Sequence, residues 1–212
     1  MTDRTGPLDF TLDTDLIDAV RNGKPWAYRT WEPEWTAVVL GRSNQPETEV
    51  HEAHCQADGI PVMRRIGGGG TVVLSPGVVV ISVAAQVQQQ FHYQEYFHQI
   101  NELVIGALQQ LGIKGLSQQG HSDICLDDRK ILGSSMYGSR KLIFYTASLL
   151  VSNDLGLIDR YLRHPSLEPD YRQGRPHQDF LTTLTQVYPH LSVSAVQHAL
   201  DATLPPRIPA IY

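Results

Sequence analysis

The chain has 212 residues, of which 42% are hydrophobic, and this composition supports one sizeable apolar core. Acidic side chains (22) outnumber basic ones (17), and the net charge of −5 argues against a general nucleic-acid or membrane-surface binder. Two cysteines cannot build a disulfide framework, and the longest apolar run, 78–85, is far shorter than the about 20 residues of a membrane-spanning helix. The start "MTDRTGPLDF" contains no apolar signal core. We therefore expect a globular protein of a reducing, cytoplasmic compartment.

The first half of the chain predicts mainly strands. In chain order we expect a short helix from Thr14 or Asp15 through Asn22, a hairpin of strands 26–31 and 36–41 joined by 32–34, a polar helix over 47–58, and strands over 60–65, 71–74 and 78–87 with a turn at 75–77. The Ser-Pro-Gly sequence of that last turn is strong turn chemistry.

The second half begins with the clearest helix. Apolar residues repeat at intervals of three and four over 92–111. After it we expect three strands within 121–151 with turns at Asp127–Asp128 and Gly138–Ser139, a short helix over 155–163, a long polar loop over 164–179, a helix over 193–202 that starts at Ser192, and an extended tail over 205–212. The pattern predicts one mixed α+β domain on a largely antiparallel sheet.

Four glycines at 67–70 separate Arg64 and Arg65 from a valine-rich stretch. The segment lacks the lysine of a Walker A loop, and a strand follows it where a dinucleotide fingerprint needs a helix. Consecutive strand residues point to opposite faces, so at most one of the two arginines faces a site beside the glycines. The bend is either a flexible hairpin connection or a place where backbone N–H groups approach a slender or anionic ligand.

A second motif carries a lysine and a carboxylate. Lys130 lies among apolar strand residues, with Gly133 three positions later and Asp123 seven positions earlier. The lysine either points outward into solvent or supplies a positive charge to phosphate or carbonyl oxygens in a pocket. A carboxylate beside a phosphate site usually serves a divalent metal or the ligand's own donors.

In this order the segments "RRIGGGGTVV", "SDICLDDRKILGSS" and "ASLLVSNDL" resemble the lipoate–protein ligase A family, and "VVLGRSNQ" resembles its early Gly-Arg-x-x-Gln segment. The resemblance runs over about 31–184. The family shares its catalytic domain with biotin–protein ligases and octanoyltransferases. The resemblance implies a class II synthetase-like α+β fold, a largely antiparallel sheet flanked by helices, and a single catalytic domain over 1–212 without a C-terminal accessory domain.

The resemblance also implies a reaction. Such enzymes use ATP and Mg²⁺ to convert lipoate or octanoate into acyl-AMP, and then acylate a lysine of a lipoyl-domain protein. The acceptors would be the E2 components of 2-oxoacid dehydrogenases or the H protein of glycine cleavage. A separate subunit could supply the accessory part, and neither a nucleic acid nor a membrane is expected as a partner.

Roles follow for individual residues by resemblance. Lys130 would contact the acyl carbonyl and the α-phosphate, and Arg65 would meet phosphate oxygens. Substrate or nucleotide contacts are expected from Gly68, Gly69, Gly70, Thr71, Asp123, Gly133 and Ser134. Asp123 is also a weak candidate Mg²⁺ ligand, and the strands over 71–74 and 78–83 would wall a narrow apolar tunnel for the acyl chain.

The sequence departs from the family pattern at three places. Gly67 replaces a frequent serine, Leu74–Ser75 replaces a His-Asp pair, and Tyr-Thr-Ala-Ser at 145–148 replaces His-His-Gly-Ser/Thr. Two alternatives therefore stay open. One is an octanoyltransferase that takes its acyl group from an acyl-carrier protein through a cysteine thioester, although Cys125 is expected to be a small buried thiol. The other is a non-catalytic module that binds acyl groups or adenylates.

Two further groups of side chains were considered. The loop over 168–180 carries Tyr171, Arg172, Arg175 and His177, and its length favours a lid that closes over the adenylate or docks the acceptor. The sequence "HEAHC" places His51, His54 and Cys55 one turn apart on a helix, where an ordinary helix face is more common than a metal site.

Overall fold

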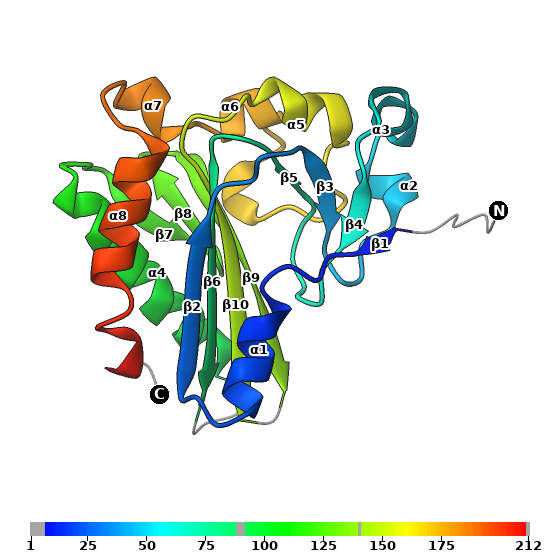
Figure 1. Ribbon diagram of the computed structural model, residues 1–212. Helices are drawn as coiled ribbons and strands as arrows, with labels where there is room; N and C mark the ends of the chain where they lie inside the picture. Colours follow the sequence, from blue (N-terminus) through cyan, green and yellow to red (C-terminus); the bar gives the residue numbers. More distant parts are fainter. Residues whose placement is uncertain (1–6, 88–91, 140, 211–212) are drawn as a thin grey trace.

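The computed structural model describes residues 7–87, 92–139 and 141–210, and it contains two β-sheets with helices around them (Figure 1). The larger sheet has the strand order β2-β6-β10-β9-β8-β7, and every neighbouring pair in it is antiparallel. Its strands are β2 (Trp26–Trp31), β6 (Val78–Gln86), β7 (Leu116–Gln119), β8 (Asp123–Leu126), β9 (Arg129–Ser139) and β10 (Leu142–Leu150).

The smaller sheet has the order β1-β4-β3-β5. Its strands are β1 (Leu8–Asp9), β3 (Ala37–Leu40), β4 (Val62–Arg64) and β5 (Val72–Leu74). The first three pair in parallel, and β5 runs antiparallel to β3. The predicted α+β class with a largely antiparallel sheet flanked by helices is confirmed, but the strands form two sheets instead of one.

Helices cover the larger sheet on both faces. They are α1 (Thr14–Arg21), α2 (Pro46–Glu49), α3 (Glu52–Asp58), α4 (Tyr93–Gln110), α5 (Gly156–Tyr161), α6 (His177–Phe180), α7 (Leu184–Val187) and α8 (Val193–Thr203), with 3₁₀ turns η1 (Asp170–Arg172) and η2 (Ile208–Ala210). Helices α4 and α8 cover one face, and α1 and the smaller sheet lie over the other (Figure 1).

The alternation of side chains along β6 explains this arrangement. Val79, Ile81 and Val83 belong to the core beneath α4 and α8, whereas Val80 belongs to a second core shared with the smaller sheet. Because successive strand side chains point to opposite faces, a continuous apolar run lets β6 bury both faces. Ser82 interrupts the run on the face of Val80, and the cavity described below lies on that face.

The predicted hairpin over 26–41 is wrong. Strand β2 pairs with β6, whereas β3 pairs with β4 and β5 in the other sheet. The turn at 75–77 likewise connects β5 and β6, which belong to different sheets. Glu32 lies in the link between β2 and β3, and its carboxylate accepts a hydrogen bond of 2.7 Å from Gly77 N–H. This hydrogen bond thus joins the β2–β3 link to the β5–β6 link, two of the connections between the sheets.

Other expectations hold in part. Helices α4 and α8 are confirmed, and Ser192 caps α8 by accepting a hydrogen bond from Ala195 N–H. The helix over 47–58 is interrupted at Val50, which forms a β-bridge with Leu162. Gly138 and Ser139 are still paired within β9, so the predicted turn there is wrong, while Asp127 adopts the left-handed conformation of a turn.

The last two loop predictions need correction. The segment 164–179 contains η1 and the start of α6, and the tail forms η2 with Ile208 fully buried, because apolar side chains in both segments reach the core. Residues 211–212 of the predicted tail lie outside the described residues. Within the described part of the chain, no helix is both long and apolar enough to cross a membrane.

Candidate active site

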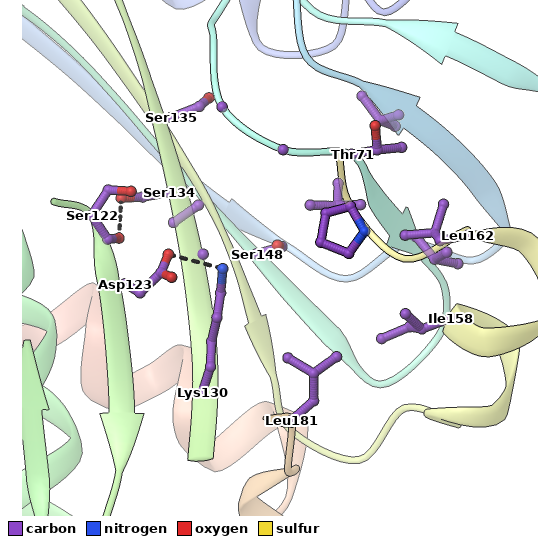
Figure 2. A pocket seen from close by; sticks show the side chains of 18 of the residues that line it. Thr71, Ser122, Asp123, Lys130, Ser134, Ser135, Ser148, Ile158, Leu162 and Leu181 are labelled. Carbon is purple, nitrogen blue, oxygen red and sulfur yellow. Dashed lines mark hydrogen bonds and ion pairs between the residues drawn. The ribbon is translucent and has the colours of Figure 1, made fainter. Parts of the chain in front are cut away.

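A cavity of about 660 Å³ lies between the two sheets. Its floor is the face of the larger sheet opposite α4, and its roof comes from β5, the glycine bend at 67–70 and the segment 162–172. Figure 2 shows Lys130 and Asp123 on one side of the cavity, with Thr71, Ile158 and Leu162 on the other. A volume of this size is typical of small-molecule sites.

Small polar side chains form the floor. The strand register aligns Ser82, Thr146 and Ser135 across β6, β10 and β9, and aligns Val80, Ser148 and Gly133 in the next row. Every one of these six residues lines the cavity. The Ser135 and Thr146 hydroxyls are 2.8 Å apart and satisfy each other. Because these side chains are short, the floor leaves room for a ligand above it.

Lys130 extends from β9 into the cavity (Figure 2). Its Nζ is 2.9 Å from Asp123 Oδ1, and 24% of its side chain is exposed. Asp123 begins β8 and pairs with Gly133, and an irregularity in the β8–β9 register falls between Ile124 and Cys125. The sequence left open whether this lysine faces solvent, and the structure places it beside the carboxylate.

Gly133 provides the space for this ion pair. A Cβ atom at Gly133 would lie 2.9 Å from Lys130 Nζ, closer than side-chain carbons approach an ammonium nitrogen. The neighbouring Ser134 hydroxyl donates a 2.7 Å hydrogen bond to the Ser122 carbonyl, which fixes the residue before Asp123 (Figure 2). The "KILGSS" segment therefore both carries the amine and shapes its surroundings.

Arg65 holds the glycine bend from within. Its guanidinium donates to the carbonyls of Gly68 and Gly70 at 2.7 Å and of Val39 at 3.2 Å, and burial lowers the pKa of Arg65 to about 10. The Nε atom is buried without a protein partner. Gly69 has φ +87°, a conformation that other residues rarely adopt. Hydrogen bonds from Arg65 therefore hold the bend in one conformation, and the bend is not a flexible hairpin connection.

Arg64 points away from the cavity. Its Nη1 donates to the carbonyls of Gly41, Arg42 and Asn44. The expectation that the two arginines face opposite ways is confirmed. Gly67 stands where the family often has serine, and a Cβ there would lie 2.8 Å from Ser135 Oγ. The Ser135 hydroxyl thus occupies the space that a side chain at position 67 would need.

An apolar wall faces Lys130. Its members are contributed by β5, β10, α5 and the segment after α6, namely Val72, Leu74, Leu150, Ile158, Leu162 and Leu181. Thr71 lies beside this wall, where its hydroxyl is 3.4 Å from Glu49 Oε2. The Glu49 carboxylate is buried and also accepts a 2.5 Å hydrogen bond from Ser166.

The segment 164–177 closes one side of the cavity. Tyr171, Arg172 and His177 line it, whereas Arg175 lies outside and binds Asp128. Arg172 is only 4% exposed, its Nη2 has no protein partner, and its guanidinium lies 4.7 Å from the centre of the Phe180 ring. Burial lowers the pKa of both Arg172 and His177.

Most residues singled out from the sequence line this cavity. They are Arg65, Gly69, Gly70, Thr71, Asp123, Lys130, Gly133, Ser134, Tyr171, Arg172 and His177. Gly68 and Arg175 do not line it: the Gly68 carbonyl accepts a hydrogen bond from Arg65, and Arg175 donates to the Tyr171 carbonyl within its own segment.

Sequence reasoning missed Asp13, Glu49, Ser82 and Ser135. Asp13 precedes α1 and resembles a helix cap, but it accepts hydrogen bonds from Arg29, Trp31 and Ser82 instead. No local pattern distinguished these polar residues from ordinary cap, helix or strand positions.

The two cysteines are buried thiols. Cys125 is fully buried, and burial raises its pKa to about 11. Cys55 is the buried residue of α3, and the His54 ring is hydrogen-bonded to the Arg160 carbonyl. Within the described residues, no group of three or more His, Cys, Asp or Glu side chains is placed to hold a metal ion.

Comparison with solved structures identifies the fold. A crystal structure of lipoate-protein ligase A bound with ATP superposes with a TM-score of 0.74 at 22% identity, over 88% of this chain and 74% of that one. The bipartite lipoate protein ligase of Thermoplasma acidophilum, studied with its E2 lipoyl domain, gives a TM-score of 0.76 at 21% identity, over 95% and 82% of the two chains. At these identities the likeness shows a shared fold.

The family is shown by sequence. Residues 7–204 match the model of the lipoyl protein ligase A/B catalytic domain, and the chain belongs to this family. The lipoate-protein ligase LplJ of Bacillus subtilis is 30% identical over 115 residues, which are 54% of this chain and 34% of LplJ. The chain thus matches about a third of the length of that curated relative.

Proposed function

We propose that the chain catalyses ATP-dependent activation of lipoate or octanoate and transfers the acyl group to a lysine of a lipoyl-domain protein. One observation carries the proposal: the Lys130 amine and the fastened glycine bend face the same cavity, which is polar at one side and apolar at the other. The family and the related ligase structure with bound ATP support this assignment.

In the first step an oxygen of the acyl carboxylate attacks the α-phosphorus of ATP. The P–O bond to pyrophosphate breaks, and acyl-AMP forms. Negative charge accumulates on phosphate oxygens, and the Lys130 ammonium, which lines the cavity beside Asp123, can stabilise it. The Arg65 guanidinium already donates to backbone carbonyls of the bend, so we assign Arg65 to holding the bend in place. Its Nε has no protein partner, and we assign this atom to a phosphate oxygen of the nucleotide.

In the second step the neutral amine of the acceptor lysine attacks the acyl carbonyl carbon, AMP leaves with the electron pair of the C–O bond, and the nitrogen gives up one proton to water as the amide forms. Lys130 again faces the oxygen on which charge develops. The wall formed by Val72, Leu150, Ile158 and Leu162 excludes water from the acyl chain, and burying each methylene contributes about 0.8 kcal/mol.

Mg²⁺ would accompany ATP. Such an ion would need only one or two protein carboxylates. We propose Asp123 as the carboxylate that would hold the Mg²⁺ ion. When bound, the ion neutralises charge on the phosphates.

The acceptor is proposed by analogy with the Thermoplasma ligase and its E2 lipoyl domain. An H protein, and a separate accessory subunit, are the further partners to test. We propose that the segment carrying Tyr171, Arg172, Arg175 and His177 covers the adenylate or contacts the acceptor, because three of these residues line the cavity.

The first test is pyrophosphate release with ATP, Mg²⁺ and either lipoate or octanoate. Lys130→Ala is expected to lower the rate about 100-fold or more, the effect of removing a charge-stabilising donor. Lys114→Ala is the matched control, because Lys114 is an exposed lysine that does not line the cavity. Circular dichroism is the check that both variants fold.

A second assay, acyl transfer from an acyl-carrier protein, helps to separate the alternatives. Acyl transfer from an acyl-carrier protein without ATP, lost in Cys125→Ser, would replace the ligase by an octanoyltransferase. Binding of acyl-adenylate without any pyrophosphate release would indicate a non-catalytic module. A Lys130→Ala variant as active as the parent would contradict the proposed mechanism.

A further inference from the structure

We infer that Tyr171 is a positioning residue for Lys130: its hydroxyl holds Asp123, and Asp123 holds the lysine amine. The inference rests on the proposed function for its catalytic consequence. It extends that function by linking the segment 164–177 to the orientation of the reactive ammonium.

The hydrogen-bond chain is continuous. Tyr171 donates its hydroxyl to Asp123 Oδ2 at 2.7 Å, and the other oxygen, Oδ1, is 2.9 Å from Lys130 Nζ. The carboxylate is thus held at both oxygens, one by a neutral donor and one by the ammonium.

The tyrosine is itself fixed. It lies in η1, and its ring packs against Phe180 with the ring centres 5.3 Å apart. Gly120 lies on the other side, where a Cβ atom would be 3.5 Å from Tyr171 Cε1. Arg175 donates to the Tyr171 carbonyl and to Asp128 in the β8–β9 turn. The Tyr171 hydroxyl therefore bonds Asp123 from a segment that these contacts hold in place.

Gly133 and Asp123 both lie close to the Lys130 amine. Gly133 has no side chain, and this leaves room for Lys130 Nζ beside β9. A Cβ atom built at Gly133 would also lie 3.8 Å from Asp123 Oδ1. Without the Tyr171 hydroxyl, Asp123 can rotate about its side-chain bonds, and the ammonium loses its fixed direction.

The test compares Tyr171→Phe with Tyr28→Phe. Tyr28 makes a similar hydrogen bond, 2.9 Å to Asp201, on β2 outside the cavity. The first readout is the rate at which acetic anhydride modifies Lys130, measured by mass spectrometry against the exposed Lys24, Lys114 and Lys141 of the same molecule. Tyr171→Phe is expected to raise the relative Lys130 rate about 10-fold, the effect of one hydrogen bond to a charged group. Tyr28→Phe should leave it unchanged.

A double-mutant cycle shows whether Tyr171 acts through Asp123. In an Asp123→Ala background, Tyr171→Phe should not alter Lys130 reactivity further. In the otherwise native chain, kcat for pyrophosphate release should fall about 10-fold, while the KM values for ATP and the acid stay within about twofold.

Two results would overturn the inference. One is an unchanged or lower Lys130 reactivity in Tyr171→Phe, and the other is an equal effect of Tyr171→Phe with and without Asp123. If the native chain releases no pyrophosphate, the proposed function fails, but Lys130 reactivity still decides whether Tyr171 positions the amine.

Discussion

At the scale of single residues, the environment of each reactive group decides what it can do. Lys130 and Asp123 were each singled out from the sequence, largely through the resemblance to the ligase family, but their ion pair was not predicted. The contact from Tyr171, 48 positions after Asp123, could not be predicted, because no local pattern links them. The same holds for Asp13, whose partners Arg29, Trp31 and Ser82 are brought together only by the fold.

Cys125 provides a prediction at this scale. Its pKa of about 11 lies above that of a free cysteine, so the thiol is protonated at pH 8 and becomes reactive only as the pH rises toward 11. At pH 8, iodoacetamide should modify Cys125 in the folded protein about 100-fold more slowly than in urea-unfolded chain. The measurement is peptide mass spectrometry over time, and equal rates in the two states would refute the buried-thiol assignment.

At the scale of elements, local patterns identified most helices and strands but not their partners. The periodicity of α4 and the Ser192 cap of α8 are local properties, and both predictions were right. Adjacent strands were assigned to a hairpin at 26–41, whereas β2 and β3 enter different sheets. Strand pairing depends on residues far apart in sequence, such as the β2–β6 ladder, and a single sequence does not display it.

The crossing between the sheets gives a stability prediction. Gly77 has φ +89°, and a Cβ atom there would collide with the Asn153 backbone. Gly77→Ala should therefore lower the free energy of unfolding by about 2 kcal/mol or more, through left-handed strain and overpacking. For a chain of this size that corresponds to a Tm about 4–8 °C lower.

Gly112→Ala is the matched control for that substitution. Gly112 has a similar φ of +82°, but nothing lies within 4 Å of a Cβ built there. Thermal unfolding should show a smaller loss of Tm for Gly112→Ala than for Gly77→Ala. Equal losses would mean that backbone strain alone, and not the contact with Asn153, makes Gly77 necessary.

At the scale of the whole molecule, the two sheets create the site. The larger sheet supplies Lys130, Asp123 and the polar floor, and the smaller sheet supplies the bend held by Arg65 and part of the apolar wall. The order of motifs indicated that glycines and lysine belong together. The cavity between the sheets, and the buried Glu49 that fastens Ser166 beside it, required the fold.

The most direct test is a crystal structure with a non-hydrolysable acyl-adenylate, the octanoyl-sulfamoyl analogue of adenosine. The account predicts the acyl chain against Val72, Leu150 and Ile158, and the Lys130 ammonium within hydrogen-bond distance of the acyl carbonyl or of the sulfamoyl group that replaces the phosphate. An analogue bound outside this cavity, or bound within it with Lys130 directed away from the acyl–sulfamoyl junction, would contradict the account.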